Sequence, residues 1–292
     1  MKIAINTRPL LEEHSHFVLE LYNALQNKGV QLHLQVNFLS WLIRKKQNVE
    51  GTIVFEGNHD LAHDLDFVFS IGGDGTLLET VTFVGSRETP IVGINAGRLG
   101  FLATVQTNEI QLALENIFAS KYKVEKRSLL KLVSDKDLFG GLNFAVNEFA
   151  ILKKDTSSMI VVHAYLDGVF LNSYWSDGLI VSTPTGSTGY SLSCGGPIVL
   201  PESNNFIIAP ISPHNLNVRP MIIPDTSELS FKIDDRKKNF LVALDSRSIP
   251  VNPNVALKVK KENFNLMLVS FEGSDFISTL RKKLNWGLDV RN

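Results

Sequence analysis

The chain has 292 residues, of which 44% are apolar and 20% charged, and its formal net charge is −1. This composition is that of a globular protein, and the near-zero charge provides no chain-wide basic field for nucleic acid or anionic lipid. The length predicts two domains. No apolar run approaches the roughly 18 residues that span a bilayer. The first ten residues lack a signal-peptide core, and a single cysteine, Cys194, suits a reducing compartment. We therefore expect a cytoplasmic protein that binds neither nucleic acid nor membrane.

The first third of the chain alternates strand-like and helix-like segments. Helical spacing of apolar residues occurs from Phe17 to Leu25, which Gly29 follows, and from Glu109 to Phe118, where Thr107 is the expected N-cap. A further short helix is expected at 38–46, and short apolar runs predict strands at 2–6, 30–36, 52–55, 66–71 and 90–95. Alternating strands and helices indicate a parallel sheet with helices on both faces.

After residue 122 the pattern changes to successive strands. The pair Asp167-Gly168 between two apolar runs predicts a hairpin turn, and the many short strands predict an antiparallel domain of two sheets. Helical spacing returns in the tail, Asp275–Gly287, which we expect to pack back on the first domain. The predicted fold is α/β + β: a Rossmann-like α/β domain at 1–122, an antiparallel β-sandwich-like domain at 123–272, and a C-terminal segment at 273–292.

A cluster of three glycines around an aspartate directly follows a predicted strand and precedes a predicted helix. It reads Gly72-Gly73-Asp74-Gly75-Thr76. A helix N-terminus presents free backbone amides that suit phosphate, and glycines let the backbone approach a ligand closely. The spacing fits neither of the two commonest nucleotide-binding fingerprints. Asp74 would repel phosphate unless a cation lay between them or unless it acted on a hydroxyl; the alternative is a tight turn with an exposed aspartate.

Three further segments are rich in polar residues or glycine. The loop 94–102 follows the next strand, so it and the glycine–aspartate turn would line one crevice, unless Phe101 merely fills the core. The pair Asn147-Glu148 interrupts an apolar strand, as at a ligand or at an ordinary edge strand. The segment Ser176–Ile198 is dense in hydroxyls and holds no charge after Asp177. It suits hydrogen bonding to a sugar or an amide better than a linker, and it lacks the G-x-S-x-G of many serine hydrolases.

These four segments, in this order, resemble the NAD kinase family. The family's GGDGT turn, N-x-G-x-L-G-F loop, N-E pair and long TPTGST-type motif match Gly72–Thr76, Asn95–Phe101, Asn147-Glu148 and Asp177–Pro197. The later segments Ser212–Pro220 and Leu244–Arg247 also look like the family. The match runs from near residue 70 to residue 250, and the long motif is its most specific part. The resemblance implies an enzyme that phosphorylates NAD to NADP with ATP or polyphosphate, works as a homodimer or homotetramer, and binds NAD between its two domains.

The resemblance also implies roles for single residues. Asp74 is expected to take the proton from the 2′-hydroxyl of the adenosine ribose. The phosphate-binding turn would consist of Gly72, Gly73, Gly75 and Thr76. The NAD contacts would be Asp74, Gly75, Phe101, Asn147, Glu148, Asp177, Thr188, Gly189, Tyr190, Ser191, Leu192 and Ser193. No residue is expected to be a resident metal ligand; Mg²⁺ or another divalent cation would arrive with ATP, and alignment and charge neutralisation would supply most of the acceleration.

The chain departs from the family pattern at a few positions. Gly189 and Cys194 stand where the family usually has Ala, and Trp175 stands where many bacterial members have Arg. Because a tryptophan can stack on a ring but cannot pair with a phosphate, the preference between NAD and NADH stays open. Ser158 and Arg247 also fall near the ligand in relatives.

Two alternative functions remain at this point: a lipid kinase that shares GGDGT, and a non-catalytic NAD(H)-binding sensor. The hydroxyl-rich segment argues against the first alternative, because it suits a polar nucleotide, and Asp74 argues against the second.

Overall fold

The computed structural model describes residues 1–8, 15–97, 99–154, 159–234 and 240–287. The chain divides into two compact units: Met1–Lys126 together with Leu266–Asn292, and Arg127–Asn265. We refer to these as unit 1 and unit 2. Unit 1 therefore contains both the N-terminal part of the chain and the C-terminal tail, as predicted for the last helix.

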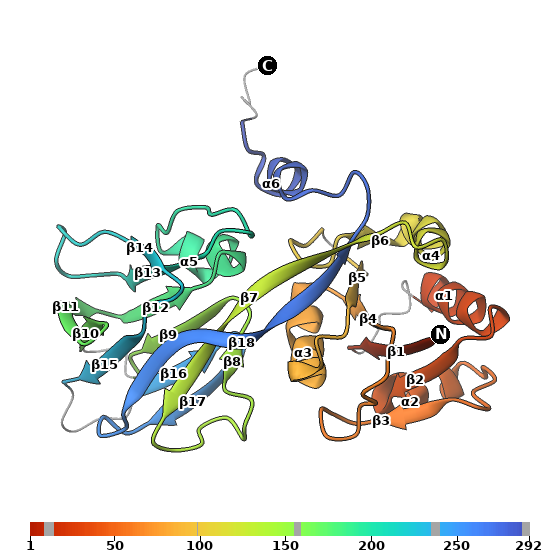
Figure 1. The fold of residues 1–292 in the computed structure, drawn as a ribbon, viewed down its shortest axis with the longest axis horizontal. Helices are drawn as coiled ribbons and strands as arrows, with labels where there is room; N and C mark the ends of the chain where they lie inside the picture. Colours follow the sequence, from red (N-terminus) through yellow and green to blue (C-terminus); the bar gives the residue numbers. More distant parts are fainter. Residues whose placement is uncertain (9–14, 98, 155–158, 235–239, 288–292) are drawn as a thin grey trace. The chain divides into compact units, whose positions relative to one another are not determined.

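Unit 1 is built on a parallel sheet with the strand order β5-β4-β1-β2-β3 (Figure 1). The strands are β1 (Lys2–Thr7), β2 (Gln31–Gln35), β3 (Ile53–Phe55), β4 (Phe67–Gly72) and β5 (Ile91–Asn95). Two more segments pair with β5: the short β6 (Val105–Gln106) and, through Leu268 opposite Ile91, the end of β18 (Leu257–Ser270). All five residues of β5 are buried, as expected for a parallel sheet covered on both faces. The predicted parallel sheet is confirmed.

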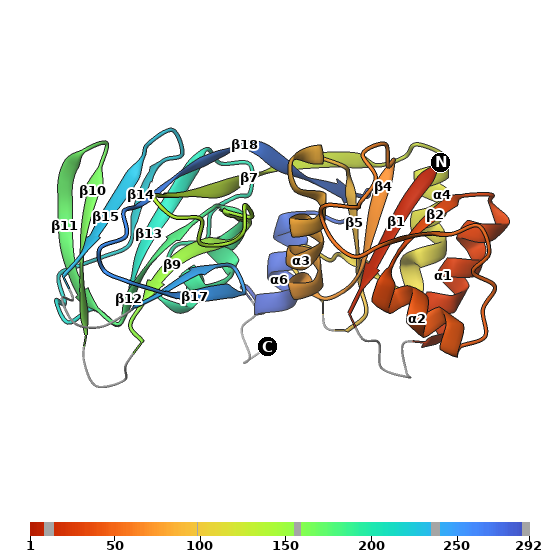
Figure 2. The same cartoon turned by 90° about the horizontal axis from the view of Figure 1, so that it is seen from below.

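Helices cover both faces of this sheet (Figure 2). α1 (Ser15–Asn27), α2 (Val36–Arg44) and α4 (Ile110–Phe118) bury their apolar stripes in one cluster on one face, and α3 (Asp74–Val84) lies on the other face. Two single turns of 3-10 helix, η2 (Gly85–Arg87) and η3 (Thr107–Glu109), complete the connections. The prediction of Thr107 as an N-cap is wrong. The cap is Gln106, one residue earlier, which caps η3 in a reciprocal capping box with Glu109.

Unit 2 consists of two sheets. One has the antiparallel order β14-β13-β12-β9-β16-β17. Its strands are β9 (Glu148–Leu152), β12 (Gly178–Ser182), β13 (Asn205–Ile211), β14 (Met221–Pro224), β16 (Phe240–Leu244) and β17 (Arg247–Val251). The other runs β11-β10-β15-β18, and β7 pairs with both β18 and β8. Its remaining strands are β7 (Lys123–Ser134), β8 (Phe144–Ala145), β10 (Ile160–Leu166), β11 (Val169–Ser176) and β15 (Leu229–Ile233).

The main core of unit 2 is an apolar cluster to which both sheets contribute, for example Phe149 and Phe206 from one sheet and Val162 and Phe231 from the other. The predicted antiparallel two-sheet domain is therefore confirmed. β10 and β11 are joined by the predicted hairpin turn, in which Asp167 (φ 50°) and Gly168 (φ 81°) both have positive φ, as a type I′ turn requires.

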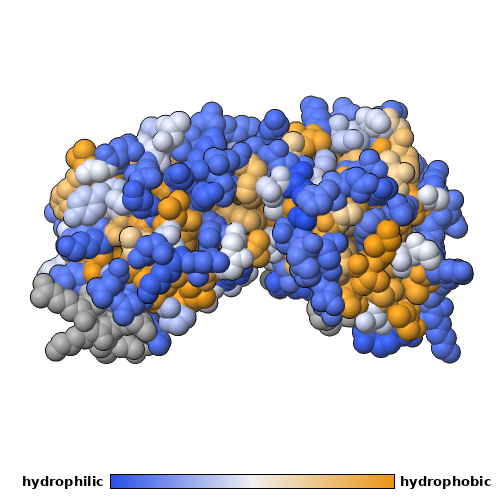
Figure 3. All heavy atoms as spheres, turned by 60° about the horizontal axis from the view of Figure 1, so that its bottom comes forward, coloured by the Kyte–Doolittle hydropathy of each residue, from blue (hydrophilic) through white to orange (hydrophobic). Residues whose placement is uncertain are grey.

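Helix is scarce in unit 2. The connection from β12 to β13 holds a 3-10 turn, η4 (Thr185–Thr188), and the short helix α5 (Tyr190–Ser193). The chain ends with α6 (Phe276–Leu284), which belongs to unit 1. None of the helices in the described ranges has the length and apolar character needed to cross a membrane. On the face shown in Figure 3, apolar side chains gather in one area of unit 1 and are interspersed with polar ones over unit 2.

Candidate active site

The glycine–aspartate turn joins β4 to α3, as predicted. Gly73 is the N-cap of α3 and Asp74 is its first residue. A Cβ at Gly72 would overlap the Thr76 side chain, whereas at Gly73 it would meet nothing within 4 Å and at Gly75 only Arg8 Nη1 at 3.6 Å. Of the three glycines in this turn, the fold itself therefore requires only Gly72. Gly73 and Gly75 leave open backbone at a helix N-terminus, where a phosphate group finds free amides.

The Asp74 carboxylate is fixed by backbone amides of the following glycine-rich loop. Its Oδ2 accepts a hydrogen bond from the Phe101 amide at 2.8 Å, and its Oδ1 accepts from the Leu102 and Ala103 amides at 3.0 Å each. Its side chain is 28% exposed, so the alternative of a tight turn with an exposed aspartate is wrong. A carboxylate offers about four acceptor positions; three are occupied here by amides, which leaves one on Oδ2.

The loop after β5 is shaped around this carboxylate. A Cβ on Gly100 would overlap the Asp74 carboxylate, so this glycine is required for the close approach. Phe101 is half-buried and its ring lies 6.0 Å from that of Phe276 in α6. Lys283 of the same helix places its Nζ 3.6 Å from Asp74 Oδ2 and 4.8 Å from the centre of the Phe101 ring. Turn, loop and last helix of unit 1 thus meet at Asp74.

In unit 2, Asn147 and Glu148 lie at the entry to β9 and are held by a buried aspartate. Asp245 accepts hydrogen bonds from the amides of Val146 (2.9 Å), Asn147 (2.7 Å) and Glu148 (3.2 Å). Burial raises the pKa of Asp245 above its ordinary value, while these three amides act in the opposite direction. β9 is a central strand, paired with both β12 and β16, so the edge-strand interpretation of the Asn-Glu pair is wrong.

Glu148 is an unusual acid. Burial, and then the charge of Asp245, raise its pKa from 4.5 to about 7, and its Oε2 is buried with no hydrogen-bond partner in the described part of the chain. At a pH between these two values, the Glu148 carboxyl has lost its proton in the unfolded chain but retains it in the folded chain. The free energy of unfolding therefore falls as the pH rises from about 4.5 to about 7, by at most about 3 kcal/mol. Strongly shifted acids of this kind concentrate at functional sites.

The hydroxyl-rich segment is tied to the Asn147-Glu148 pair. Thr183 donates from Oγ1 to the Val146 carbonyl at 2.6 Å and from its amide to the Asn147 carbonyl at 2.9 Å. A Cβ on Gly186 would overlap the Asn147 carbonyl, so the segment needs a glycine at the contact. These bonds are internal to unit 2 and show that the segment is a structured part of the fold.

Several predicted NAD residues lie in η4, in α5 and at the glycine between them, beside Glu148. They are Thr188, Gly189, Tyr190, Ser191, Leu192 and Ser193. Gly189 is close-packed: a Cβ there would stand 3.2 Å from Glu148 Oε2. Ser191 Oγ and Thr185 Oγ1 are buried and have no hydrogen-bond partner among the described residues. Buried polar atoms normally find partners, so these two hydroxyls leave hydrogen-bonding capacity unused inside this part of unit 2.

The remaining predicted residues have other partners. The Asp177 carboxylate forms an ion pair with Lys153 at 2.5 Å. The Arg247 guanidinium donates to the Leu142 carbonyl at 2.6 Å and to the Phe144 carbonyl, so the structure gives it a role in holding the β8 region. Trp175 is 55% exposed and its ring lies 6.4 Å from that of His214. Ser158 lies outside the described residues.

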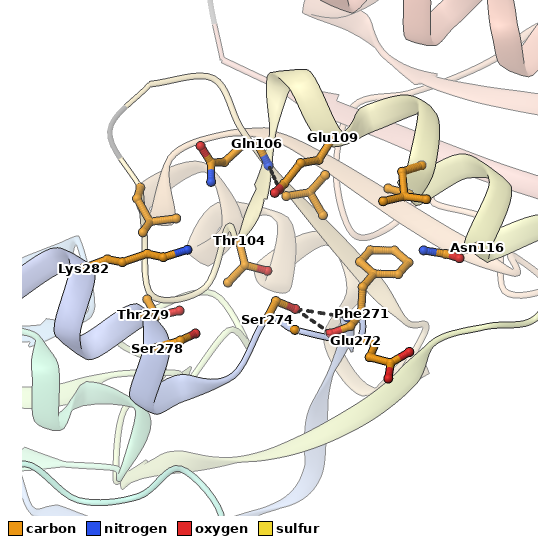
Figure 4. Close-up of a pocket in the computed structure, with 15 residues that line it drawn as sticks. Thr104, Gln106, Glu109, Asn116, Phe271, Glu272, Ser274, Ser278, Thr279 and Lys282 are labelled. Carbon is orange, nitrogen blue, oxygen red and sulfur yellow. Dashed lines mark hydrogen bonds between the residues drawn. The ribbon is translucent and has the colours of Figure 1, made fainter.

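A cavity of about 310 Å³ also occurs in unit 1 (Figure 4). Residues around α4, the segment after β18, and α6 line it, among them Glu109, Phe271, Thr279 and Lys282. None of the residues predicted for the active site contributes to it. The Lys282 ammonium points into this cavity, whereas its neighbour Lys283 reaches Asp74.

Three residues of the site were not among those predicted to contact the substrates. Asp245 stands in the recognised segment Leu244–Arg247, and a lone acid at the end of an apolar strand is a signal that could have found it. Thr185 lies within the long motif but outside the positions carried over. Lys283 gave no signal, because one lysine among the basic residues Arg281, Lys282 and Lys283 at the end of a helix looks like an ordinary helix terminus.

The candidate site thus has two parts: a carboxylate fixed at a helix N-terminus of the α/β unit, and a carboxyl group with a raised pKa in the β unit. Two family models match the chain: the ATP-NAD kinase N-terminal domain matches residues 3–122, and the ATP-NAD kinase C-terminal domain matches residues 146–271. The chain belongs to the NAD kinase family.

Individual relatives agree with this placement. The chain is 53% identical to the NAD kinase of Cytophaga hutchinsonii and 45% identical to that of Flavobacterium psychrophilum, in each case over 100% of both chains. Among solved structures, an NAD kinase from Archaeoglobus fulgidus in complex with ATP has a TM-score of 0.76 at 25% identity, covering 98% of this chain and 99% of that one. The fold is also that of yeast NADH kinase complexed with NADH, with a TM-score of 0.86 at 23% identity over 99% of this chain and 89% of that chain.

Proposed function

We propose that this chain transfers the γ-phosphoryl group of ATP to the 2′-hydroxyl of the adenosine ribose of NAD, giving NADP and ADP. The observation that carries this proposal is the Asp74 carboxylate, held by three amides at the first residue of α3. A fixed acceptor for a hydroxyl proton thus stands beside the open backbone of Gly73 and Gly75, where phosphate is favoured. The names of the relatives, and the ATP bound to the Archaeoglobus fulgidus enzyme, support the same substrates.

Asp74 would act through the remaining acceptor position on Oδ2. As the ribose oxygen bonds to the γ-phosphorus and the bond to ADP breaks, the hydroxyl proton passes to this oxygen. Phosphoryl transfer has a loose transition state in which positioning and charge stabilisation dominate, and a placed general base adds about 10²–10⁴-fold. The amide bonds that fix Asp74 provide that placement.

Unit 2 would recognise the dinucleotide through its unsatisfied polar atoms. Glu148 Oε2 accepts hydrogen bonds, and the Ser191 and Thr185 hydroxyls both donate and accept; all three are buried without a partner in the described residues. Ribose hydroxyls and amide groups supply the missing donors and acceptors. The prediction that Asn147, Glu148 and the residues from Thr188 to Ser193 contact NAD rests on this complementarity and on the family resemblance.

The divalent cation would arrive with the nucleotide. Mg²⁺ is usually held by one or two carboxylates together with substrate phosphates. Asp74 is a single carboxylate with three of its acceptor positions occupied by amides, and the fourth is assigned to the ribose hydroxyl, so it does not fit a resident cation site. When bound to ATP, Mg²⁺ would offset the charge of the phosphates near Asp74.

The experiment that tests the function is NADP formation by the purified chain from ATP, Mg²⁺ and NAD. NADH as acceptor and polyphosphate as donor are measured beside them. Phosphorylated product with NAD supports the proposal, and the ratio of rates with NAD and NADH settles the acceptor preference. Absence of product with every donor and acceptor, together with measurable NAD binding, would instead establish a non-catalytic sensor.

We extend the proposal to assembly and location on the same resemblance. A homodimer or homotetramer is expected, and light scattering during size-exclusion chromatography measures it. A cytoplasmic location is expected from the composition and the single cysteine, and cell fractionation measures it.

A further inference from the structure

The last helix of unit 1 is a defined element with both ends fixed. Asp275 caps α6, its carboxylate accepting a hydrogen bond from the Ser278 amide at 2.8 Å, and Asn285 ends the helix in the left-handed conformation with φ 50°. Thr279 and Leu280 are buried. The position of the neighbouring side chains of α6 is therefore set by packing as well as by charge.

Two faces of α6 serve different surroundings. Ser278, Thr279 and Lys282 line the cavity shown in Figure 4. Phe276 instead packs on Phe101, and Lys283 contacts both Phe101 and Asp74. Lys282 and Lys283 are adjacent in the sequence and carry the same charge, but their side chains have different surroundings.

Lys283 is held at Asp74 by two interactions. Its ammonium lies 3.6 Å from Asp74 Oδ2 and 4.8 Å from the centre of the Phe101 ring, within the range of a cation–π contact. Within the described ranges no other ion pair involves Asp74. The oxygen that faces Lys283 is also the one that has an acceptor position left for a substrate hydroxyl.

We propose that Lys283 is a positioning residue of the reaction and acts through Asp74; this inference rests on the proposed function. Its charge holds Oδ2 against rotation of the carboxylate, and its contact with Phe101 ties the loop that carries the amide donors to the same helix. Lys283 exchanges no proton: the proton of the ribose hydroxyl passes to Asp74 and the leaving group is ADP. The C-terminal helix is then a third component of the catalytic centre, after the glycine–aspartate turn and the following loop.

The effect should appear in kcat. An exposed ion pair corresponds to at most about fivefold, and a misplaced catalytic group can cost about 100-fold, so Lys283→Met should lower kcat between about fivefold and 100-fold. The KM values for NAD and ATP should stay within about threefold, because Lys283 holds the base and contacts neither substrate. Lys283→Arg should recover most of the rate, because it retains a cation of similar reach.

Lys282→Met is the matched control. It removes the same charge from the same last turn of α6, and so the same helix-terminus stabilisation, but its side chain faces the cavity. Steady-state NADP formation is measured for wild type, the two Lys283 variants and the control, with Tm recorded for each. The proposal predicts a kcat loss in Lys283→Met alone, recovery in Lys283→Arg, and a slightly lower Tm in Lys283→Met than in Lys282→Met, because only Lys283→Met loses the ion pair and the cation–π contact.

Three outcomes would overturn the inference. Lys283→Met could match Lys282→Met in kcat, Lys283→Arg could be as slow as Lys283→Met, or the fall in kcat could be accompanied by an equally large rise in the KM for both substrates. The first would show that the ion pair does not affect the reaction, and the second that the cation is irrelevant. The third would make Lys283 a substrate-binding residue. Wild-type activity separates these results from failure of the proposed function, since a wild type without product refutes the function itself.

Discussion

Replacing Asp74 by Asn tests the assignment of the proton acceptor most directly. In the wild-type chain, Oδ1 accepts from the amides of Leu102 and Ala103 at 3.0 Å each and Oδ2 accepts from that of Phe101 at 2.8 Å. The Asn side chain has one acceptor oxygen, so it can keep the first two bonds. Its NH₂ group then faces the Phe101 amide, donor against donor. The substitution thus loses one hydrogen bond to a charged group and removes the charge from two others.

The structural cost follows from these three bonds. A hydrogen bond to a charged group is worth about 1.5–3 kcal/mol and a neutral one about 0.5–1.5 kcal/mol, which gives a sum of about 4 kcal/mol. Solvent screening lowers this to about 2–3 kcal/mol, because the Asp74 side chain is 28% exposed. At about 2–4 °C per kcal/mol for a chain of this size, Asp74→Asn should lower Tm by about 5–10 °C.

The catalytic cost should be much larger than this destabilisation explains. Asp74→Asn should lower kcat for NADP formation by about 10²–10⁴-fold, while calorimetry should find NAD binding within about fivefold of wild type. Val81→Ala is the control: Val81 is 2% exposed on the same helix, and its truncation costs a comparable free energy without touching the carboxylate. Val81→Ala should keep a near-normal kcat. A kcat for Asp74→Asn within tenfold of wild type, or an equal loss in Val81→Ala, would refute the assignment.

Three further predictions concern other parts of the site. Glu148→Gln should raise the free energy of unfolding by about 3 kcal/mol at pH 8 and by less than about 1 kcal/mol at pH 5. The wild-type carboxyl, with a pKa of about 7, is buried at both pH values but carries its charge only at the higher one. Chemical denaturation measures both values, and equal effects at the two pH values would contradict a buried charge. Trp175→Ala should raise KM for NAD more than KM for ATP in steady-state kinetics; equal changes would place this exposed ring outside the NAD site. Gly100→Ala should lower both kcat, by at least about tenfold, and Tm, because its Cβ would overlap the Asp74 carboxylate. An unchanged Tm would show that the loop relaxes without cost.

Periodicity in the sequence predicted the order of elements well. The spacing from Phe17 to Leu25 gave α1, the short apolar runs gave the parallel strands of unit 1, and Asp167-Gly168 gave the β10–β11 turn. These signals are local, since each depends on residues within one element. The N-cap at Thr107 failed because capping depends on which nearby side chain reaches the free amides, and Gln106 does so here.

The functional residues divide in the same way. The sequence by itself determined the family motifs. It identified Asp74 as an acid in a glycine-rich turn and Glu148 as an acid that interrupts an apolar strand, because their immediate neighbours are part of the motif. Only the tertiary structure decided that three amides from residues 101–103 fix Asp74, that Asp245 organises Asn147-Glu148 from about a hundred residues away, and that Arg247 bonds to backbone carbonyls. It alone distinguished Lys283 from Lys282. These partners are distant in the sequence, and the direction of a side chain on a helix or strand end is set by what packs against it, which no local pattern records.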